Sequence, residues 1–390
     1  FLDITISRQI YGKIYTYLSE LEEIVNQKII KVLEFHAKMP YSVINIFKRQ
    51  SPNFVNREMK AACVAAESNT DCYVTYRLRS KAMTDIPILP HLSCDLDNKI
   101  AIVMQGPLMV ENDFTLETAK FYKRCYPQAI IIVSTWKDSD SETIERIKQQ
   151  NVVVVLSDLP DNCGNLNINY QTVNTLAGVK KAKEMGAEFV CKTRTDQRIY
   201  HTDAMRYLAN LVRTFPVNNE DFVKKQKGRI VTMCMPYGDL FYPYCLADFL
   251  YFGYTEDIEE LFSLPLDKRK KGGYGNGKTR RKVAEEMIAP EIQFLREYIR
   301  RMGGNNECTV KSYWQFTKNH LVTINKDEIG LFWPKYEGRY SENTQNGSYY
   351  LNEEENAFRC YNFDFIRWLN LYQDTLKYDK KYENYADFIL

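Results

Sequence analysis

The 390-residue sequence lacks the features that mark several large classes of protein. Its ten cysteines include no C-x-x-C pair and its four histidines show no metal-ligand spacing, so no structural zinc site is expected. Neither G-x-S-x-G nor a G-x-G-x-x-G after a strand-like run occurs, so hydrolase and dinucleotide-oxidoreductase functions lack their usual motifs. The apolar runs are shorter than the roughly 20 residues of a bilayer-spanning helix.

An excess of one charge is missing as well. The chain has 52 Lys plus Arg against 50 Asp plus Glu, a net charge of +2. This balance gives no global reason to bind nucleic acid, which is not expected as a partner. The scattered cysteines indicate a reducing compartment, and a cytoplasmic location is therefore predicted. With 45% hydrophobic and 13% aromatic residues, the chain has the composition of a globular protein.

Three regions are predicted along the chain. Residues 1–97 read as a mainly helical region, where apolar residues at steps of three or four over 8–38 form a stripe. That stripe would serve as core, as a contact with a second copy of the chain, or as a docking face. Residues 98–335 form the predicted catalytic domain. Residues 336–390 are predicted as an appendage, with a hairpin turn at Asn346-Gly347 and an aromatic helix within 358–378.

The middle region alternates between strand-like and helical segments. The apolar, β-branched runs are 100–104, 129–134, 152–156 and 189–193, and the helical patterns between them are 114–126, 141–149 and 169–185. This alternation predicts an α/β fold, a mostly parallel sheet flanked by helices. Sheets of this kind bind ligands at the carboxyl ends of their strands, so functional residues are expected directly after each run.

The most informative of these strand ends holds Arg194, Asp196 and Arg198. Their alternate spacing would place the three side chains on one face if the extended conformation continued. Arginine forks suit phosphate oxygens, and a carboxylate between two cations stays ionised and can hold a metal or a sugar hydroxyl. A purely structural Arg–Asp–Arg network is the alternative.

A family resemblance is carried by several segments in this order. They are IAIVMQGPL (100–108), FYKRCYPQAIIIVSTWKDSD (121–140) and CKTRTDQRI (191–199), followed by DFLYFGYTEDIEELF (248–262) and APEIQFLREYI (289–299). Together they resemble the WavE family, which is associated with lipopolysaccharide and surface-glycan synthesis and is similar to GT-A glycosyltransferases. The last two segments look like the acceptor-side strand and helix and the carboxylate-bearing helix of such enzymes.

The resemblance, which covers residues 99–333, implies a GT-A-like (Rossmann-like) sheet and a nucleotide-sugar donor. It assigns Gln105, Gly106 and Pro107 to the loop under the nucleotide, Asp138 and Asp158 to the base and ribose, and Asn169 and Gln171 to the diphosphate. Asp196 would stand for the last carboxylate of the D-x-D metal motif, whereas Arg194 replaces the first. Dependence on Mn²⁺ or Mg²⁺ is therefore left open, because Arg194 could itself neutralise the diphosphate.

Glycosyl transfer also needs a carboxylate that accepts the proton of the attacking hydroxyl, and cations at the leaving phosphate. Arg194 and Arg198 would supply the cations. Glu291, after Pro290 at the start of a helical segment, is the first candidate base, and Asp248 is the second. The structural alternative for Glu291 is that it complements the helix dipole. A single displacement with one base predicts inversion at the anomeric carbon.

A basic segment, Lys268–Lys282, carries eight Lys and Arg and no acid. Within it, residues 272–279 match G-x-x-x-x-G-K-[ST], but no buried strand can precede them, so a phosphate-binding P-loop is not predicted. The segment is predicted to be a solvated loop, a lid on the donor diphosphate, or a patch facing anionic lipid that carries the acceptor. The last alternative would place the protein peripherally at the inner face of a membrane.

These patterns predict a glycosyltransferase that moves a sugar from a nucleotide-sugar donor to a surface-glycan acceptor of lipopolysaccharide or capsule type. If the basic segment faces anionic lipid, that acceptor would be linked to a lipid. One alternative is a nucleotidyltransferase acting on sugar phosphates, which would release pyrophosphate. The other is a non-catalytic nucleotide-sugar or glycan-binding scaffold, which would bind without turnover.

Overall fold

A computed structural model describes residues 52–68, 74, 76, 78–82, 99–235, 239–270, 272–273, 275, 277–335 and 361–388. The chain divides into two compact units, residues 1–79 and 80–390. In the first unit the structure gives one helix, α2 (Pro52–Glu67), which begins at a proline, a favourable first helical residue. The apolar stripe over 8–38 and the turn at 346–347 lie outside the described residues. Both predicted region boundaries fall at undescribed segments, so the three-region division stays a prediction.

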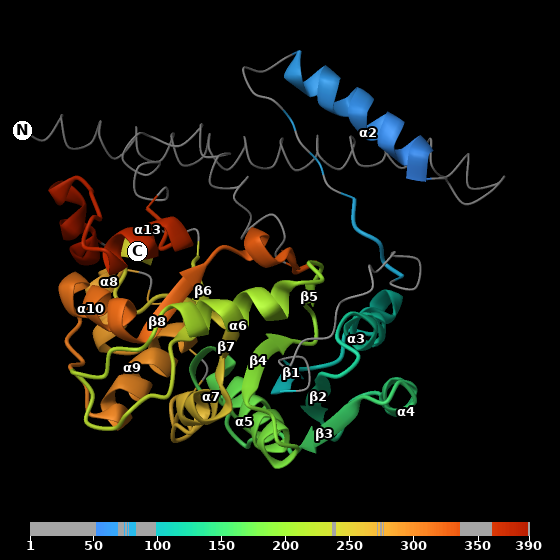
Figure 1. Ribbon diagram of the computed structural model, residues 1–390, viewed down its shortest axis with the longest axis horizontal. Helices are drawn as coiled ribbons and strands as arrows, with labels where there is room; N and C mark the ends of the chain where they lie inside the picture. The colour runs from blue at the N-terminus through green and yellow to red at the C-terminus, as the bar shows by residue number, and fades with distance from the viewer. Residues whose placement is uncertain are drawn as a thin grey trace, which may run out of the picture. The chain divides into compact units, whose positions relative to one another are not determined.

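A seven-stranded sheet with the order β3-β2-β1-β4-β7-β6-β8 forms the centre of the second unit (Figure 1). The strands are β1 (Ile100–Gln105), β2 (Ile130–Trp136), β3 (Val153–Ser157), β4 (Phe189–Arg194), β6 (Ile230–Met233), β7 (Ala247–Tyr254) and β8 (Leu321–Ile324). The pairs β1–β2, β1–β4, β2–β3 and β6–β8 are parallel, and only β7 runs antiparallel to its neighbours. The predicted fold class, a mostly parallel α/β sheet, is confirmed.

The first four strands are the β-branched runs of the sequence, with ends shifted by two residues or fewer. Strand β1 is buried along its whole length, as a central strand of a parallel sheet should be. Strand β3 lies at the edge of the sheet and is only half-buried. Burial on both faces explains why these runs are continuously apolar instead of alternating.

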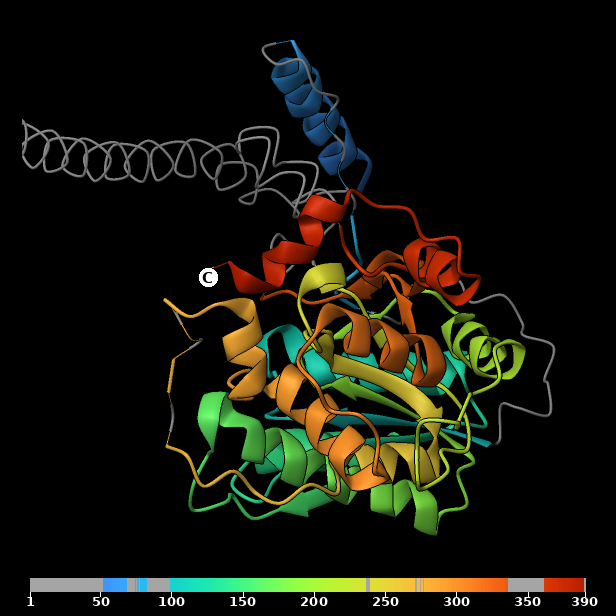
Figure 2. The same cartoon turned by 90° about the vertical axis from the view of Figure 1, so that its left-hand side faces the viewer.

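Helices cover both faces of the sheet (Figures 1 and 2). Those closest to the site are α5 (Ile168–Glu184) and α7 (Thr255–Phe262) on one face, and α3 (Phe114–Cys125) and α6 (Ala204–Thr214) on the other. Helix α5 contacts β1, β2 and β3 closely because it carries Gly178. A Cβ at Gly178 would lie 2.4 Å from Cγ1 of Val103, a distance that real side chains do not tolerate.

The remaining elements lie around the sheet and the helices just described. They are α4 (Ser141–Lys148), α8 (Arg280–Glu285), α9 (Pro290–Met302), α10 (Val310–His320), α13 (Phe365–Tyr372), the antiparallel pair β5 (Arg198–Ile199) and β9 (Leu331–Phe332), and the 3-10 turns η2 (Glu111–Asp113), η3 (Asn165–Asn167), η4 (Asp239–Phe241), η5 (Lys326–Ile329) and η7 (Lys380–Asp387). Among the helices that the structure describes, none combines the length and apolar character needed to cross a bilayer.

The predicted aromatic helix near the end of the chain is present as α13, but it is shorter than the segment 358–378. It begins at Phe365, where Asp364 caps it by accepting a hydrogen bond from the Arg367 N–H. Trp368 is fully buried and lies edge-on to Phe215 at 4.9 Å. The helix ends at Tyr372, and Asp374 has a positive φ that breaks the helical path.

Candidate active site

Because β1 to β4 are parallel, their carboxyl ends meet at one edge of the sheet, and the antiparallel strand β7 begins at the same edge. The register pairs Gln105 with Arg194 and Lys192 with Tyr251. Asp248 therefore lies next to the end of β4. This edge thus brings together Gln105 on β1, Arg194 on β4 and Asp248 on β7, three residues that the sequence singles out.

Arg194 and Asp196 form a two-pronged ion pair at this edge. Nε of Arg194 donates to Oδ1 of Asp196 at 2.8 Å, and Nη2 donates to Oδ2 at 3.0 Å. The side chains keep 24% and 20% of their surface exposed, and the guanidinium lies 4.8 Å from the ring centre of Trp333. An arginine held against an indole and partly open to solvent is suited to binding phosphate oxygens.

Arg198 does not join this pair, so the expected shared face is wrong. The extended conformation ends at Arg194, where the Gln197 N–H turns back to the Arg194 carbonyl. Arg198 is 1% exposed, and its guanidinium donates to Thr118 Oγ1 at 2.9 Å and to main-chain carbonyls, including that of Phe114 at 3.2 Å. Arg198 therefore anchors α3 below the edge, and the structure gives no support to a role for it in donor binding.

The donor set at Asp196 does not fit a metal held by protein side chains. Both carboxylate oxygens already accept from Arg194. Within the part of the chain that is described, no three His, Cys, Asp or Glu side chains come together in a way that could hold a metal ion. A divalent ion would have to displace Arg194 and take its other ligands from elsewhere.

The loop Gln105-Gly106-Pro107 is fastened to the turn after β4. The Thr195 N–H donates to the Gln105 carbonyl at 3.1 Å, and Thr195 Oγ1 donates to the Pro107 carbonyl at 2.6 Å. Gly106 has a φ of +121°, and a Cβ there would lie 3.2 Å from Thr195 Oγ1, so both conformation and space favour glycine. The Gln105 side chain is 2% exposed, and its Nε2 finds no acceptor among the described residues.

Asp138 and Asp158 follow β2 and β3 at the same edge, where both are exposed. Asp158 Oδ2 accepts from Lys137 Nζ at 2.7 Å in a pair that is more than half exposed on both sides. A pair so solvated contributes little to stability, which leaves its groups available to a ligand. Next to them, Trp136 and Tyr170 meet edge to face at 5.6 Å.

Asn169 is committed to the structure of a loop. It is 2% exposed, its Oδ1 accepts from the Asp267 N–H at 2.7 Å, and its Nδ2 donates to the Asp267 carbonyl at 2.8 Å. Nδ2 also donates to the Asn162 carbonyl at 2.9 Å, so both ends of the side-chain amide are engaged within the loop. The structure therefore does not place Asn169 where it could contact a donor diphosphate.

A buried lysine, Lys192 on β4, is the residue that the sequence interpretation missed. It is fully buried, and burial lowers its pKa to about 7. Its Nζ donates to Gln171 Oε1 at 2.7 Å and to the Asp248 carbonyl at 2.6 Å. The signal was present in the sequence, since a lysine inside the apolar run F-V-C-K-T must either terminate the strand or find buried partners.

The two candidate bases, Asp248 and Glu291, are both half-buried. Asp248 Oδ2 accepts from Gln171 Nε2 at 2.6 Å, and Glu291 lies in the first turn of α9. Burial raises the pKa of Tyr251 and of Cys245, and the charges of both carboxylates raise these pKa values further. Asp248 lies on β7 and Glu291 on α9, a helix that contacts β7.

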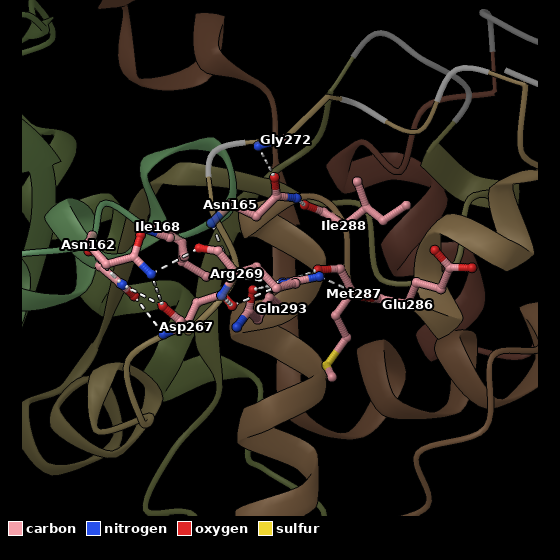
Figure 3. Close-up of polar contacts among 12 residues, drawn as sticks. Asn162, Asn165, Ile168, Asp267, Arg269, Gly272, Glu286, Met287, Ile288 and Gln293 are labelled. Carbon is pink, nitrogen blue, oxygen red and sulfur yellow. Dashed lines mark hydrogen bonds and ion pairs between the residues drawn. The ribbon is translucent and has the colours of Figure 1, made fainter.

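The basic segment 268–282 is held at both ends, and Figure 3 shows the contacts at its start. Arg269 donates to both oxygens of Asp267, to the carbonyls of Glu286 and Met287, and to Gln293 Oε1 at 2.7 Å. Arg281 forms a two-pronged pair with Asp387, at 2.6 and 3.0 Å. The described residues 263–270, which come before residues 272–279, form no strand, and the helix that follows, α8, has only six residues.

Asn165 joins the basic segment to the loop before α5. Its Nδ2 donates to the Ile288 carbonyl at 2.6 Å, its Oδ1 accepts from the Gly272 N–H at 2.9 Å, and its own N–H donates to Asp267 Oδ2 at 3.2 Å (Figure 3). The figure shows Asp267 and Arg269 between Asn162 and Asn165 on one side and Met287 and Gln293 on the other. The start of the segment is therefore ordered by neutral amides, main-chain groups and the Asp267–Arg269 ion pair.

Comparison with known proteins gives one family. A model described as WavE lipopolysaccharide synthesis matches residues 100–390, well over half of the chain. No curated protein sequence matches.

Several solved structures are similar over part of the chain. One is a cytidylyltransferase from Leptospira borgpetersenii, with 15% identity, 43% of this chain and 65% of that chain covered, and a TM-score of 0.28. Another is glucosyl-3-phosphoglycerate synthase from Mycobacterium tuberculosis with Mn²⁺, UDP-glucose and glycerol 3-phosphate, with 16% identity, coverages of 53% and 66%, and a TM-score of 0.31. This chain thus spans less than two thirds of either structure, and similarity at this level identifies neither substrate nor mechanism.

Proposed function

The chain belongs to the WavE lipopolysaccharide synthesis family, and we propose that it is a glycosyltransferase that moves a sugar from a nucleotide-sugar donor to a surface glycan of lipopolysaccharide or capsule type. The single observation that carries the proposal is the composition of one sheet edge. There a partly open arginine and a half-buried aspartate, Arg194 and Asp248, stand on neighbouring strands.

Arg194 supplies what the leaving group needs. When the bond between the anomeric carbon and the phosphate oxygen breaks, the electron pair stays on the nucleoside diphosphate, which gains charge. A fixed guanidinium stabilises that charge more than it stabilises the intact donor. Arg194 is fixed by Trp333 and Asp196, and we propose that it turns its exposed side to the diphosphate.

Asp248 and Glu291 supply the base. The acceptor hydroxyl oxygen forms the new bond to the anomeric carbon, and its proton passes to a carboxylate. We propose Asp248 for this role, with Glu291 as the competing assignment. For Asp248, Oδ2 accepts from Gln171, while no hydrogen bond to Oδ1 is found among the described residues. One carboxylate oxygen thus fixes the group and the other is available to the hydroxyl. A single displacement of this type inverts the anomeric configuration.

The role of a divalent metal is proposed to be secondary. The donor set at Asp196 does not fit a protein-held ion, and Arg194 carries positive charge at the same place. We therefore expect donor binding without added Mn²⁺ or Mg²⁺.

The test is a panel of UDP-, GDP-, CMP- and dTDP-sugars, each with and without Mn²⁺, read by thermal unfolding and then by release of nucleotide. A donor that binds only the folded state raises the melting temperature by mass action. Release of nucleoside mono- or diphosphate with sugar transfer supports the proposal. A parallel assay with a nucleoside triphosphate and a sugar phosphate tests the alternative, because pyrophosphate release there would assign the chain to nucleotidyltransferases. A thermal shift without turnover in either assay would assign it to binding scaffolds.

A further inference from the structure

Lys192 is an unusual feature of the second unit because it is a fully buried lysine at the centre of a sheet. Its Nζ lies 6.0 Å from the ring centre of Tyr251 and 5.7 Å from that of Phe262. Such a burial is costly, so its polar end must be fully used. Both described acceptors of its Nζ, Gln171 and Asp248, belong to the candidate site.

The hydrogen bonds run in one direction through Gln171. A lysine amine only donates in these contacts, so the oxygen of the Gln171 amide must face Lys192. The nitrogen of the same amide then faces Asp248, and Nε2 donates to Oδ2 at 2.6 Å. A neutral amine still has two N–H groups, which suffices for both of its bonds, so the orientation does not depend on the charge of Lys192.

We infer that Lys192 and Gln171 are positioning residues for Asp248, which hold its carboxylate by Oδ2 and direct Oδ1 toward the acceptor hydroxyl. Lys192 holds the strand as well as the side chain, because it also donates to the Asp248 carbonyl at 2.6 Å. This inference rests on the proposed function, in which Asp248 takes the proton of the hydroxyl that attacks the anomeric carbon.

The charges around Lys192 fit this role. Asp248 and Asp196 favour its charged form, whereas burial and the neighbouring Arg194 oppose it. Lys192 is thus linked electrostatically to the proposed base and to the proposed phosphate-binding pair. A donor chain that ends on one carboxylate oxygen fixes the orientation of that carboxylate.

The test uses Gln171→Glu and Lys192→Met in the full chain, with Gln226→Glu as the matched control. Gln226 is also a buried amide with both ends bonded, since Nε2 donates to the carbonyls of Gly228 and His320 and Oε1 contacts His320 Nδ1. Gln226 precedes β6 and takes no part in the site. Gln226→Glu therefore shows how much activity is lost when the same chemical change affects folding alone.

With a donor found in the panel above, we expect nucleotide release by Gln171→Glu and Lys192→Met to fall about tenfold or more in kcat, with KM for the donor nearly unchanged. In Gln171→Glu the added carboxylate raises the pKa of Asp248, so the acid limb of the kcat profile moves to higher pH. Gln226→Glu should keep the profile of the wild type. If Gln171→Glu instead follows Gln226→Glu in both kcat and pH profile, the positioning role is wrong while the proposed function stands.

A second measurement does not depend on turnover. In protein labelled with ¹³C at aspartate carboxyls, Asp248 is identified by the signal lost in Asp248→Asn, and its pKa is read by titration. We expect that pKa to rise in Gln171→Glu and to stay unchanged in Gln226→Glu. An equal pKa in all three proteins would overturn the inference, whether or not any sugar nucleotide is turned over.

Discussion

At the scale of single residues, removal of the Arg194 guanidinium is expected to weaken the binding of the nucleoside diphosphate. Arg194→Ala loses the guanidinium fork, and Arg194→Lys keeps the charge without the fork. Charge-assisted hydrogen bonds are worth about 1.5–3 kcal/mol, so we expect the Kd for the nucleoside diphosphate to rise about 10- to 100-fold in Arg194→Ala and less in Arg194→Lys. Isothermal titration measures both. Unchanged affinity in Arg194→Ala would remove Arg194 from the donor site.

Asp248 and Glu291 compete for one role, and isosteric amides separate them. Removal of a general base costs roughly 10²- to 10⁴-fold in rate. We expect this loss for Asp248→Asn and a loss below about tenfold for Glu291→Gln, because only Asp248 is held by the Gln171 amide. Initial rates at saturating donor make the comparison, with melting temperatures as the check on folding. The reverse order of losses would make Glu291 the base.

Lys192 also makes stability depend on pH. Its pKa is about 7 in the folded protein against an ordinary value of 10.5. Between these values the unfolded chain binds more protons than the folded one, so this group makes stability increase as pH rises from about 7 to 10. Lys192→Met lacks that contribution.

We therefore expect the free energy of unfolding of the wild type, relative to Lys192→Met, to increase across this range in urea titrations at several pH values. A relative stability that is flat or that falls with pH would show that the native Lys192 amine titrates normally.

At the scale of elements, the strands of the parallel half were predictable because each is a short, continuously apolar β-branched run. β6 and β8 are harder to predict, because they have four residues each and pair with each other across 91 positions of the chain. The same limit applies to the site. The strand ends could be placed from the sequence, but the turn after Arg194 sends Arg198 to the opposite side, and Asn169 is taken up by Asp267.

The link between the basic segment and α5 is testable at Asn165, which is 6% exposed. Asn165→Ala removes two side-chain hydrogen bonds and leaves the Ile288 carbonyl and the Gly272 N–H without them. We expect a loss of about 1–3 kcal/mol in the free energy of unfolding, measured in urea.

Asn162→Ala is the comparison, since Asn162 is half-buried and its bonds to the carbonyls of Asp267 and Arg269 are longer, at 3.3 and 3.1 Å. Its loss should be the smaller one. Equal losses would mean that burial of the amide does not set the cost.

At the scale of the whole molecule, the net charge of +2 hides a basic segment, but the structure pairs much of that charge. Arg269, Lys278, Arg281 and Lys282 have acidic partners in Asp267, Glu286, Asp387 and Glu285. The local field is therefore weaker than the sequence suggests. Contact of Lys268–Lys282 with a membrane and pairing of two chains through the N-terminal helix remain proposals, and they do not follow from charge alone.

The resemblance to the WavE family is confirmed, and the match extends to residue 390, beyond the predicted limit at 333. The C-terminal residues are part of the folded unit because α13 packs on α10 and β8. The guanidinium of Arg229 lies 5.7 Å from the ring centre of Trp368, and Arg229 is only 2% exposed.

We expect Trp368→Ala to cost about 3–5 kcal/mol in the free energy of unfolding, because it leaves a large cavity next to a buried charge. Ile366→Ala, on the same helix and 70% exposed, should stay within about 0.5 kcal/mol of the wild type. Chemical denaturation measures both. A small loss in Trp368→Ala would show that the C-terminal helix is not an integral part of this unit.

The position of β7 between β4 and β6 has a kinetic consequence. The pairing of β7 with β4 joins residues 59 to 65 positions apart along the chain, and the pairing of β4 with β1 joins residues 89 positions apart. Such non-local pairing is slow. Asp248 lies on β7, whereas Lys192 lies on β4 and Gln171 on α5, both earlier in the chain. During refolding, nucleotide turnover should therefore return with the slowest phase, after most of the helical signal has recovered.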